Sequence, residues 1–226
     1  MKQALIVQLI FVVLILSGCG TQVHHFVKSG ETLYAVSFYY GVDYHDVARW
    51  NNIKPPYIIK PGQRLRMAPP VGEARQVTRP KAVDVTRPAG SGATMPDRPS
   101  ASAAPQWRWP APGKLANTFS DRDNGRKGID IINREGTPVR AAAGGKVVYA
   151  GTGLARYGNL IIIKHSGKYL SAYAHNRKVF VQEGDEVSAG QMIAEMGRNP
   201  SSQSMLHFEI RAYGQPVDPQ RYLPKK

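Results

Sequence analysis

The pattern of apolar and polar residues divides the chain into four stretches of different character. An almost unbroken apolar run over residues 4–16 comes first. Short periodic segments follow over residues 24–67, and then a stretch rich in Pro, Ala, Ser and Arg without periodicity over residues 68–105. Short apolar runs separated by Gly and Pro fill residues 106–226. This division predicts a targeting segment, a small domain, an extended or disordered linker and a larger domain.

Residues 24–67 carry the signals of a strand, two helices and a second strand. The turn pair at Gly30 ends the first strand, and Thr32 is placed to cap a helix that stops at Gly41. Asp43 can cap a second helix, which ends at the two asparagines that follow it. At helical spacing, the residues expected inside the domain are Leu33, Val36, Ser37, Tyr40, Val47, Trp50 and Leu65.

Residues 106–226 predict an antiparallel β domain, because many short runs alternate with Gly and Pro turns. The run Ile161-Ile162-Ile163 is expected to be a strand buried on both faces. His165 follows that strand and is interpreted as a structural residue. The expected strands are residues 114–119, 128–132, 138–142, 145–150, 159–164, 169–174, 179–181 and 206–211.

The charge of the chain predicts an anionic partner. The chain carries 30 Lys and Arg against 16 Asp and Glu, a net charge of +14. Nucleic acid is not expected as that partner, because the N-terminus directs the chain out of the cytoplasm and no zinc-finger spacing or basic heptad is present. Peptidoglycan carboxylates or an acidic membrane surface fit better. The basic residues are spread out, so an ordinary solvated surface is the alternative.

The N-terminus predicts export and a lipid anchor. The apolar run is shorter than the roughly 20 residues that span a bilayer, which indicates a signal peptide over residues 1–18. Leu16-Ser17-Gly18-Cys19 resembles a bacterial lipobox. The resemblance implies acylation of Cys19, a short lipidated tether over residues 19–23 and, because Gly20 is not Asp, the inner leaflet of the outer membrane. An ordinary signal peptide with an incidental cysteine is the alternative.

Residues 24–67 resemble a LysM domain. The motifs that carry the resemblance are Val27 to Leu33, Tyr40-Gly41-Val42, Asn51-Asn52-Ile53 and Ile59 to Leu65. It implies a small α+β fold of order βααβ that binds glycans containing N-acetylglucosamine. The implied binding residues are Gly30, Glu31, Thr32, Leu33, Tyr57 and Ile58. Two alternatives stay open: Tyr57 packs beside the preceding prolines, and Leu33 belongs to the core.

The stretch from Asn124 to His207 resembles the LytM or lysostaphin-type zinc endopeptidases, which cut peptidoglycan peptides. That family has the pattern His-x-x-x-Asp, then Tyr-x-His, then His-x-His, and here Asp130, His175 and His207 match it. The resemblance implies a two-sheet antiparallel sandwich over residues 106–226, with a groove over one sheet.

Two positions depart from that pattern: Arg126 replaces the first ligand histidine, and Met205 replaces the first histidine of His-x-His. A catalytic zinc needs three protein ligands, and a guanidinium has no lone pair to offer. A thioether cannot transfer protons. We therefore expect no catalytic residue, no metal site and no cofactor. Arg126 is expected to pair with Asp130 in place of the metal charge, or else to face solvent.

The whole arrangement resembles the NlpD-type murein hydrolase activators. Five motifs carry this resemblance: Gly125 to Ile131, Tyr157 to His165, Tyr173 to Asn176, Leu206 to Arg211 and Arg221 to Pro224. It implies a non-catalytic lipoprotein that activates periplasmic N-acetylmuramoyl-L-alanine amidases when daughter cells separate. The implied amidase-contact groove contains Arg126, Asp130, His175, Met205 and His207.

Two other functions stay open at this stage. The first is a zinc-dependent peptidoglycan endopeptidase that uses Asp130, His207 and an unidentified third ligand. The second is a structural lipoprotein that tethers the outer membrane to the cell wall through the LysM domain.

Overall fold

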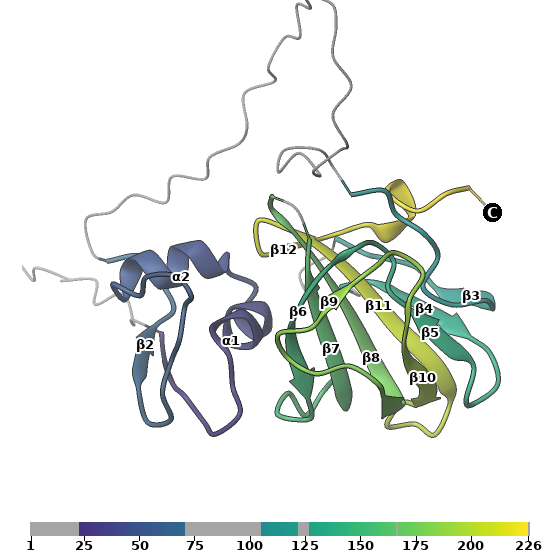
Figure 1. Ribbon diagram of the computed structural model, residues 1–226, viewed down its shortest axis with the longest axis horizontal. Helices are drawn as coiled ribbons and strands as arrows, with labels where there is room; N and C mark the ends of the chain where they lie inside the picture. Colours follow the sequence, from purple (N-terminus) through teal and green to yellow (C-terminus); the bar gives the residue numbers. More distant parts are fainter. Residues whose placement is uncertain (1–22, 71–104, 122–126, 166, 226) are drawn as a thin grey trace, which may run out of the picture.

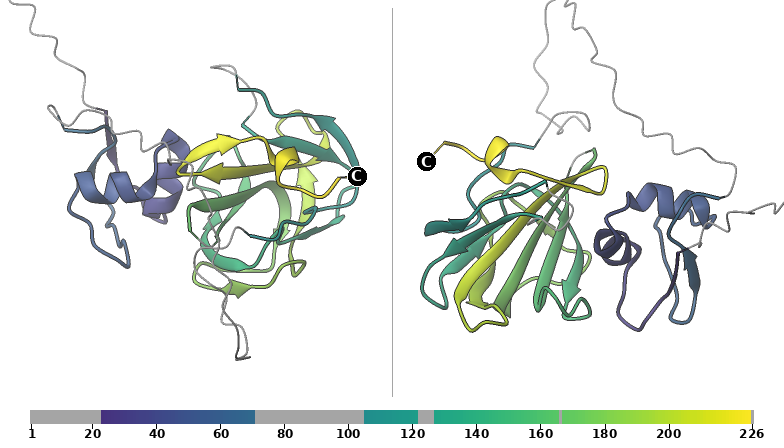
Figure 2. Two further views of the ribbon diagram at one scale, coloured as in Figure 1. Left: turned by 90° about the horizontal axis from the view of Figure 1, so that it is seen from above. Right: turned by 180° about the vertical axis from the view of Figure 1, so that it is seen from behind.

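The computed structural model describes residues 23–70, 105–121, 127–165 and 167–225. Its described residues form two units that lie side by side, a small helical one and a larger β unit (Figures 1 and 2). The predicted signal peptide, Cys19, the interior of the linker and Arg126 lie outside the described residues. Within the described part of the chain, no helix is both long and apolar enough to cross a membrane.

The small unit has the predicted order of strand, helix, helix and strand. These elements are β1 (His24–Phe26), α1 (Leu33–Tyr40), α2 (Tyr44–Trp50) and β2 (Arg64–Arg66). The two strands pair antiparallel. Thr32 caps α1 by accepting a hydrogen bond from the Ala35 N–H, and Asp43 caps α2 in the same way from His45. Gly41 ends α1 at a φ of +67°, a left-handed conformation that glycine adopts at little cost.

Helix α1 is buried on more than one side. Leu33, Val36 and Ser37 are almost completely buried, and Leu33 and Val36 pack with Val47 in the core of the small unit. Ala35 and Phe38 are equally buried, but they pack in a different cluster, formed with residues of the β unit. A helix with apolar residues on more than one face has to be covered on each of those faces. Helix α1 is therefore shared by the two units.

The β unit contains ten antiparallel strands linked by hydrogen bonds into one sheet. Its central order is β3-β4-β11-β10-β8-β7-β6-β9, with β12 on β11 and β5 on β10. The strands are β3 (Lys114–Asn117), β4 (Ile129–Ile132), β5 (Pro138–Arg140), β6 (Gly145–Gly151), β7 (Asn159–Lys164), β8 (Tyr169–Val179), β9 (Glu186–Val187), β10 (Met192–Arg198), β11 (Ser204–Ala212) and β12 (Gln215–Val217). The short helix η1 (Pro219–Arg221) follows.

The antiparallel β fold is confirmed, but the expectation of two separate sheets is not. The first half of β8, Tyr169 to Ala174, pairs with β11, whereas Asn176 to Val179 pairs with β10. Strand β8 bends between these halves at His175, whose φ is +63°. One bent strand thus joins what would otherwise be two layers. The expected separate strand at 179–181 is also wrong, because β8 runs on to Val179.

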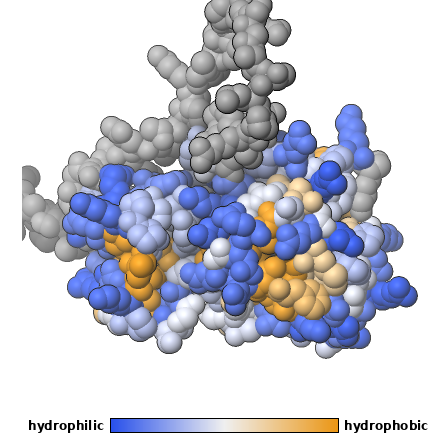
Figure 3. Space-filling view, viewed as in Figure 1, coloured by the Kyte–Doolittle hydropathy of each residue, from blue (hydrophilic) through white to orange (hydrophobic). Residues whose placement is uncertain are grey.

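Alternation along the strands gives the sheet two different faces. Ile161 and Ile163 of β7 point into the main core of the β unit, and Leu160 and Ile162 point the opposite way into the cluster that contains Phe38. All four are fully buried. The isoleucine run is therefore buried on both faces, as predicted, and the small unit covers the outer one. Apolar surface is otherwise confined to separate patches among hydrophilic residues in the view of Figure 3.

We predict that Gly128→Ala destabilises the β unit by about 2 kcal/mol or more, because it overpacks a closed site. A Cβ atom at Gly128 would overlap the carbonyl oxygen of Phe208 on β11. Gly144→Ala is the matched control, since its added carbon would lie 3.4 Å from the nearest atom, the Val187 carbonyl oxygen. Urea denaturation of both variants measures the effect. Equal stability of the two variants would contradict the close approach of β4 and β11.

Candidate functional site

The site begins where β4 and β11 lie side by side. Their antiparallel register places His207 opposite Asp130. Both side chains lie on the outer face of the sheet, because Ile129 and Ile131 on either side of Asp130 point into the main core. His207 Nδ1 lies 2.7 Å from Asp130 Oδ1, and Asn117 Nδ2 donates to Asp130 Oδ2 at 2.8 Å. Asp130 is thus held from two sides.

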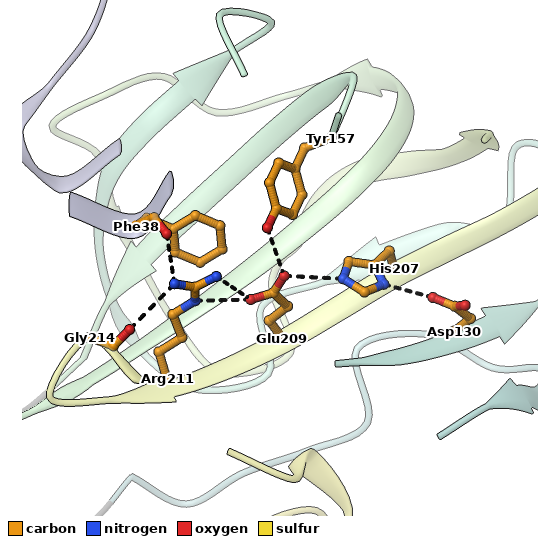
Figure 4. Close-up of polar contacts among 7 residues, drawn as sticks. All are labelled: Phe38, Asp130, Tyr157, His207, Glu209, Arg211 and Gly214. Atoms are coloured by element: carbon orange, nitrogen blue, oxygen red, sulfur yellow. Dashed lines mark hydrogen bonds and ion pairs between the residues drawn. The ribbon is translucent and has the colours of Figure 1, made fainter. Parts of the chain in front are cut away.

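A line of polar contacts continues along β11, because every second residue shares the outer face. His207 Nε2 lies 3.2 Å from Glu209 Oε1, and Arg211 Nε donates to Glu209 Oε2 at 2.9 Å. Tyr157 donates its hydroxyl to Glu209 Oε1 at 3.1 Å. Arg211 Nη1 reaches the small unit, where it donates to the carbonyl oxygen of Phe38 at 2.7 Å (Figure 4).

These contacts fix the charge of His207. Each ring nitrogen faces a carboxylate oxygen, and a carboxylate only accepts, so both nitrogens carry hydrogen and the ring is an imidazolium. Burial lowers the pKa of His207, but the hydrogen bonds and charges of Asp130 and Glu209 outweigh it and raise the pKa to about 9. Burial likewise opposes ionisation of Glu209, and Arg211 and His207 overcome it and hold its pKa below the usual range.

His175 lies beside this line of contacts in a different charge state. Its ring centroid is 6.3 Å from that of His207, and its φ of +63° is uncommon for a residue other than glycine. Burial and the positive charge of His207 lower the pKa of His175, against the opposing effect of Asp130. The neutral ring therefore adjoins a protonated one. Such strained backbone is more common at functional sites than elsewhere.

Met205 shares the outer face of β11 but has little exposed surface. Its exposed fraction is 4%, and its sulfur accepts a hydrogen bond from Asn199 Nδ2 at 3.1 Å. It lies opposite Ile132 of β4 and Gly197 of β10. The structure thus brings Asp130, His175 and His207 together and places Met205 at the edge of the group. The pairing of Arg126 with Asp130 stays a prediction.

The described residues do not fit a zinc ion of the peptidase type. Asp130 and His207 would supply two ligands, but both nitrogens of His207 are engaged with carboxylates. A metal ligand has to be a neutral imidazole, whereas two facing carboxylates favour the protonated ring of His207. Within the described residues, no group of three or more His, Cys, Asp or Glu side chains is arranged to hold a metal.

His165 is structural, as predicted. Its Nδ1 lies 2.7 Å from the Gly144 carbonyl oxygen and its Nε2 lies 2.8 Å from the Ser171 hydroxyl. Burial lowers its pKa to about 4.

The residues predicted to bind glycan have different surroundings. Glu31 accepts hydrogen bonds from Lys28 N–H and lies 2.7 Å from His25 Nε2, so it closes the turn in front of α1. Leu33 is fully buried and belongs to the core, whereas Ile58 is 71% exposed.

Tyr57 packs edge-on against Tyr44, with ring centroids 5.3 Å apart, and one face of the small unit thus carries a group of tyrosines. Thr32 caps α1 and also donates to Val148 of the β unit. Their role in glycan binding stays a prediction.

The sequence did not reveal that Glu209, Arg211 and Phe38 continue the line of polar contacts from His207. The signal for the first two is the alternation His-x-Glu-x-Arg between the apolar residues Phe208 and Ile210, which places three ionisable groups on one face of a strand. The signal for Phe38 is the apolar circumference of its helix. The partners of each group come from distant segments, so these signals identify a face and not its contacts.

Comparison with known proteins agrees with this architecture. The LysM domain model matches residues 25–68, and the model for Peptidase family M23 matches residues 124–219. A chain of the solved SpoIIQ–SpoIIIAH pore-forming complex superimposes with a TM-score of 0.50 at 23% identity, covering 54% of this chain and 94% of its own, which supports the fold alone. The protein therefore joins a LysM domain to an M23-type β domain.

Three relatives extend over most of the chain. Lipoprotein NlpD/LppB homolog of Pseudomonas aeruginosa is 41% identical over 91% of this chain and 78% of its own length. Uncharacterized lipoprotein YgeR of Escherichia coli is 42% identical over 97% of this chain and 92% of its own length. Murein hydrolase activator NlpD of Escherichia coli is 37% identical over 88% of this chain and 67% of its own length. The chain belongs to the NlpD/LppB lipoprotein family.

We predict that the imidazole signal of His207 titrates with a midpoint near pH 9 in NMR spectra of the whole chain. Because its pKa is raised above 6.5, protonated His207 stabilises the fold fully below pH 6.5, and this stabilisation is lost as the pH rises through 9. Glu209→Gln removes one of the two carboxylates and is expected to lower the midpoint. Glu183→Gln, in an exposed turn, is the control and leaves it unchanged. A wild-type midpoint at or below 6.5 would contradict the imidazolium.

Proposed function

We propose that this chain is a non-catalytic outer-membrane lipoprotein that activates a periplasmic N-acetylmuramoyl-L-alanine amidase. In this proposal, Cys19 carries the lipid and the chain faces the periplasm. The LysM domain binds peptidoglycan, and the outer face of the β unit around Asp130, His175 and His207 contacts the amidase. The name of the Escherichia coli relative, murein hydrolase activator, supports the activating role.

The observation that carries the proposal is the position of His207 between two carboxylates. In a zinc hydrolase of this fold, Asp130 and the histidine would share a metal that activates water. Here Asp130 and His207 form an ion pair at 2.7 Å, so a proton takes the place of the metal charge. With Arg126 at the first ligand position and Met205 in place of a histidine, the family pattern retains only two metal ligands, and His175 has no metal-bound water to act on.

Activation then follows from binding alone. An amidase with closed and open states shifts towards the open one only if this chain binds that state more tightly, since equal affinity shifts nothing. Arg126 is the proposed anchor of that contact, because arginine is enriched among residues that dominate binding energy at interfaces. His175 and Met205 are proposed contact residues and have no chemical role.

We predict that Arg126→Glu abolishes amidase stimulation and leaves glycan binding intact, because it reverses the charge of the anchor. Release of dye from labelled peptidoglycan, in the presence of a purified periplasmic amidase, measures stimulation. Arg221→Glu is the control, since that side chain is 83% exposed on η1 and is expected to stimulate normally. Full stimulation by the Arg126 variant would refute the assignment of this face.

The match to Peptidase family M23 favours a second candidate, a zinc-dependent peptidoglycan endopeptidase. Its ligands would be Asp130, His207 and one further residue. Elemental analysis of the purified chain separates the candidates. One zinc per chain, lost in Asp130→Asn, would support the hydrolase, and substoichiometric zinc that this substitution does not change would support the activator.

A further inference from the structure

The small unit rests on the outer face of the sheet, next to the polar line that contains His207. Ala35 and Phe38 of α1 are 0% and 1% exposed, and they pack against residues of β6, β7 and β8 such as Ile162 and Ala172. The ring of Phe38 lies with its centroid 5.4 Å from that of Tyr157. Helix α1 therefore covers part of this face, beside the proposed amidase contact.

Backbone groups of the LysM domain accept side-chain hydrogen bonds from the β unit. Arg211 donates to the Phe38 carbonyl oxygen at 2.7 Å, and its guanidinium carbon lies 3.6 Å from the centroid of the Phe38 ring. Gln215 Nε2 donates to the Gly41 carbonyl oxygen at 2.6 Å. The turn at Gly214 approaches so closely that a Cβ atom there would overlap the backbone of Val42.

The predicted glycan-binding loop lies at the same interface. The Thr32 hydroxyl donates to the Val148 carbonyl oxygen of β6 at 3.1 Å and accepts from the Ala35 N–H. A hydroxyl has only one hydrogen to donate, so a sugar that accepts from Thr32 has to displace Val148. The docked β unit thus occupies part of the surface that a glycan would use.

The tyrosines of the small unit meet the β unit as well. Lys164 of β7 lies over the rings of Tyr34 and Tyr44, 5.8 and 5.3 Å from their centroids. Tyr57, one of the predicted glycan-binding residues, contacts both rings edge-on. A sugar polymer lying along Thr32 and Tyr57 would therefore compete with the β unit for this surface, at Val148 of β6 and Lys164 of β7.

We propose that the LysM domain is a removable cover on the outer face of the sheet, and that glycan binding and docking of this domain exclude one another. The use of the uncovered face, which is contact with an amidase, rests on the proposed function. In this arrangement, α1 covers part of the face as long as the chain is not bound to peptidoglycan. A glycan strand at Thr32 and Tyr57 releases the domain and exposes the surface beside His207.

Two general arguments support a contact that opens. Interfaces between domains of one chain resemble transient protein interfaces, so relative movement is the default expectation. Coupling is also reciprocal: the factor by which docking weakens glycan binding equals the factor by which glycan weakens docking. Weakening the interface by mutation should therefore strengthen glycan binding, without any change in the glycan-binding residues.

We predict that Phe38→Ala in the full chain increases the affinity for an N-acetylglucosamine pentamer about fivefold or more, the usual lower range of such coupling. Tyr39→Ala is the matched control, an adjacent aromatic residue on the same helix that is 52% exposed. It is expected to bind as the wild type does. Isothermal titration calorimetry measures the affinities.

In the wild-type chain, the pentamer should also shift the methyl NMR signals of Ile162 and Ala172, which lie under α1. Equal affinities of the wild type and Phe38→Ala, unmoved methyl signals, or no binding of the pentamer by either protein would overturn the inference.

A second variant tests the same interface in case Phe38→Ala does not fold. Gln215→Ala removes only the bond to the Gly41 carbonyl oxygen, and a smaller gain in affinity is expected from it. Circular dichroism checks the fold of each variant. None of these measurements involves an amidase, so a chain that couples glycan to docking but stimulates no amidase would refute the proposed function and leave this inference standing.

Discussion

The outer face of the β unit depends on one buried positive charge, the imidazolium of His207 between Asp130 and Glu209. Charges alternate along this line, since Arg211 follows Glu209 and balances it. Removal of Glu209 would leave the buried guanidinium of Arg211 without its carboxylate partner, which is far more costly than the net gain from the intact pair. The four groups therefore form a unit.

The same line of charges joins the site to the LysM domain. Arg211 contacts Glu209 on one side and the Phe38 carbonyl oxygen on the other, so its contacts depend on whether α1 is docked. When the domain leaves, Arg211 loses that acceptor and the ring beneath its guanidinium. The side chains around His207 then lie at an open surface. Glycan binding and the proposed partner contact are thus linked through one arginine, and no large change within the sheet is required.

The sequence predicted local features well, because these depend on neighbouring residues. The caps at Thr32 and Asp43 and the structural role of His165 follow from short-range patterns and are confirmed. Strand β10 was missed, since Met192 to Arg198 mixes apolar and polar residues without alternation and pairs with β5 and β8, which are distant in sequence, as well as with β11, which follows it. The contacts of Glu209 depend on the same kind of long-range pairing. Sequence motifs gave the family and the altered positions, and the structure adds how the altered site is held together.

In the proposed function, this chain activates another enzyme and does not itself cut peptidoglycan. The most direct test mixes the purified, chelator-stripped full chain with a periplasmic amidase and labelled peptidoglycan. We expect dye release only when both proteins are present, and we expect stripping metal from this chain to leave that release unchanged. Release by this chain alone, lost on stripping and restored by zinc, would contradict the proposed function and would mean that Asp130 and His207 hold a catalytic metal after all.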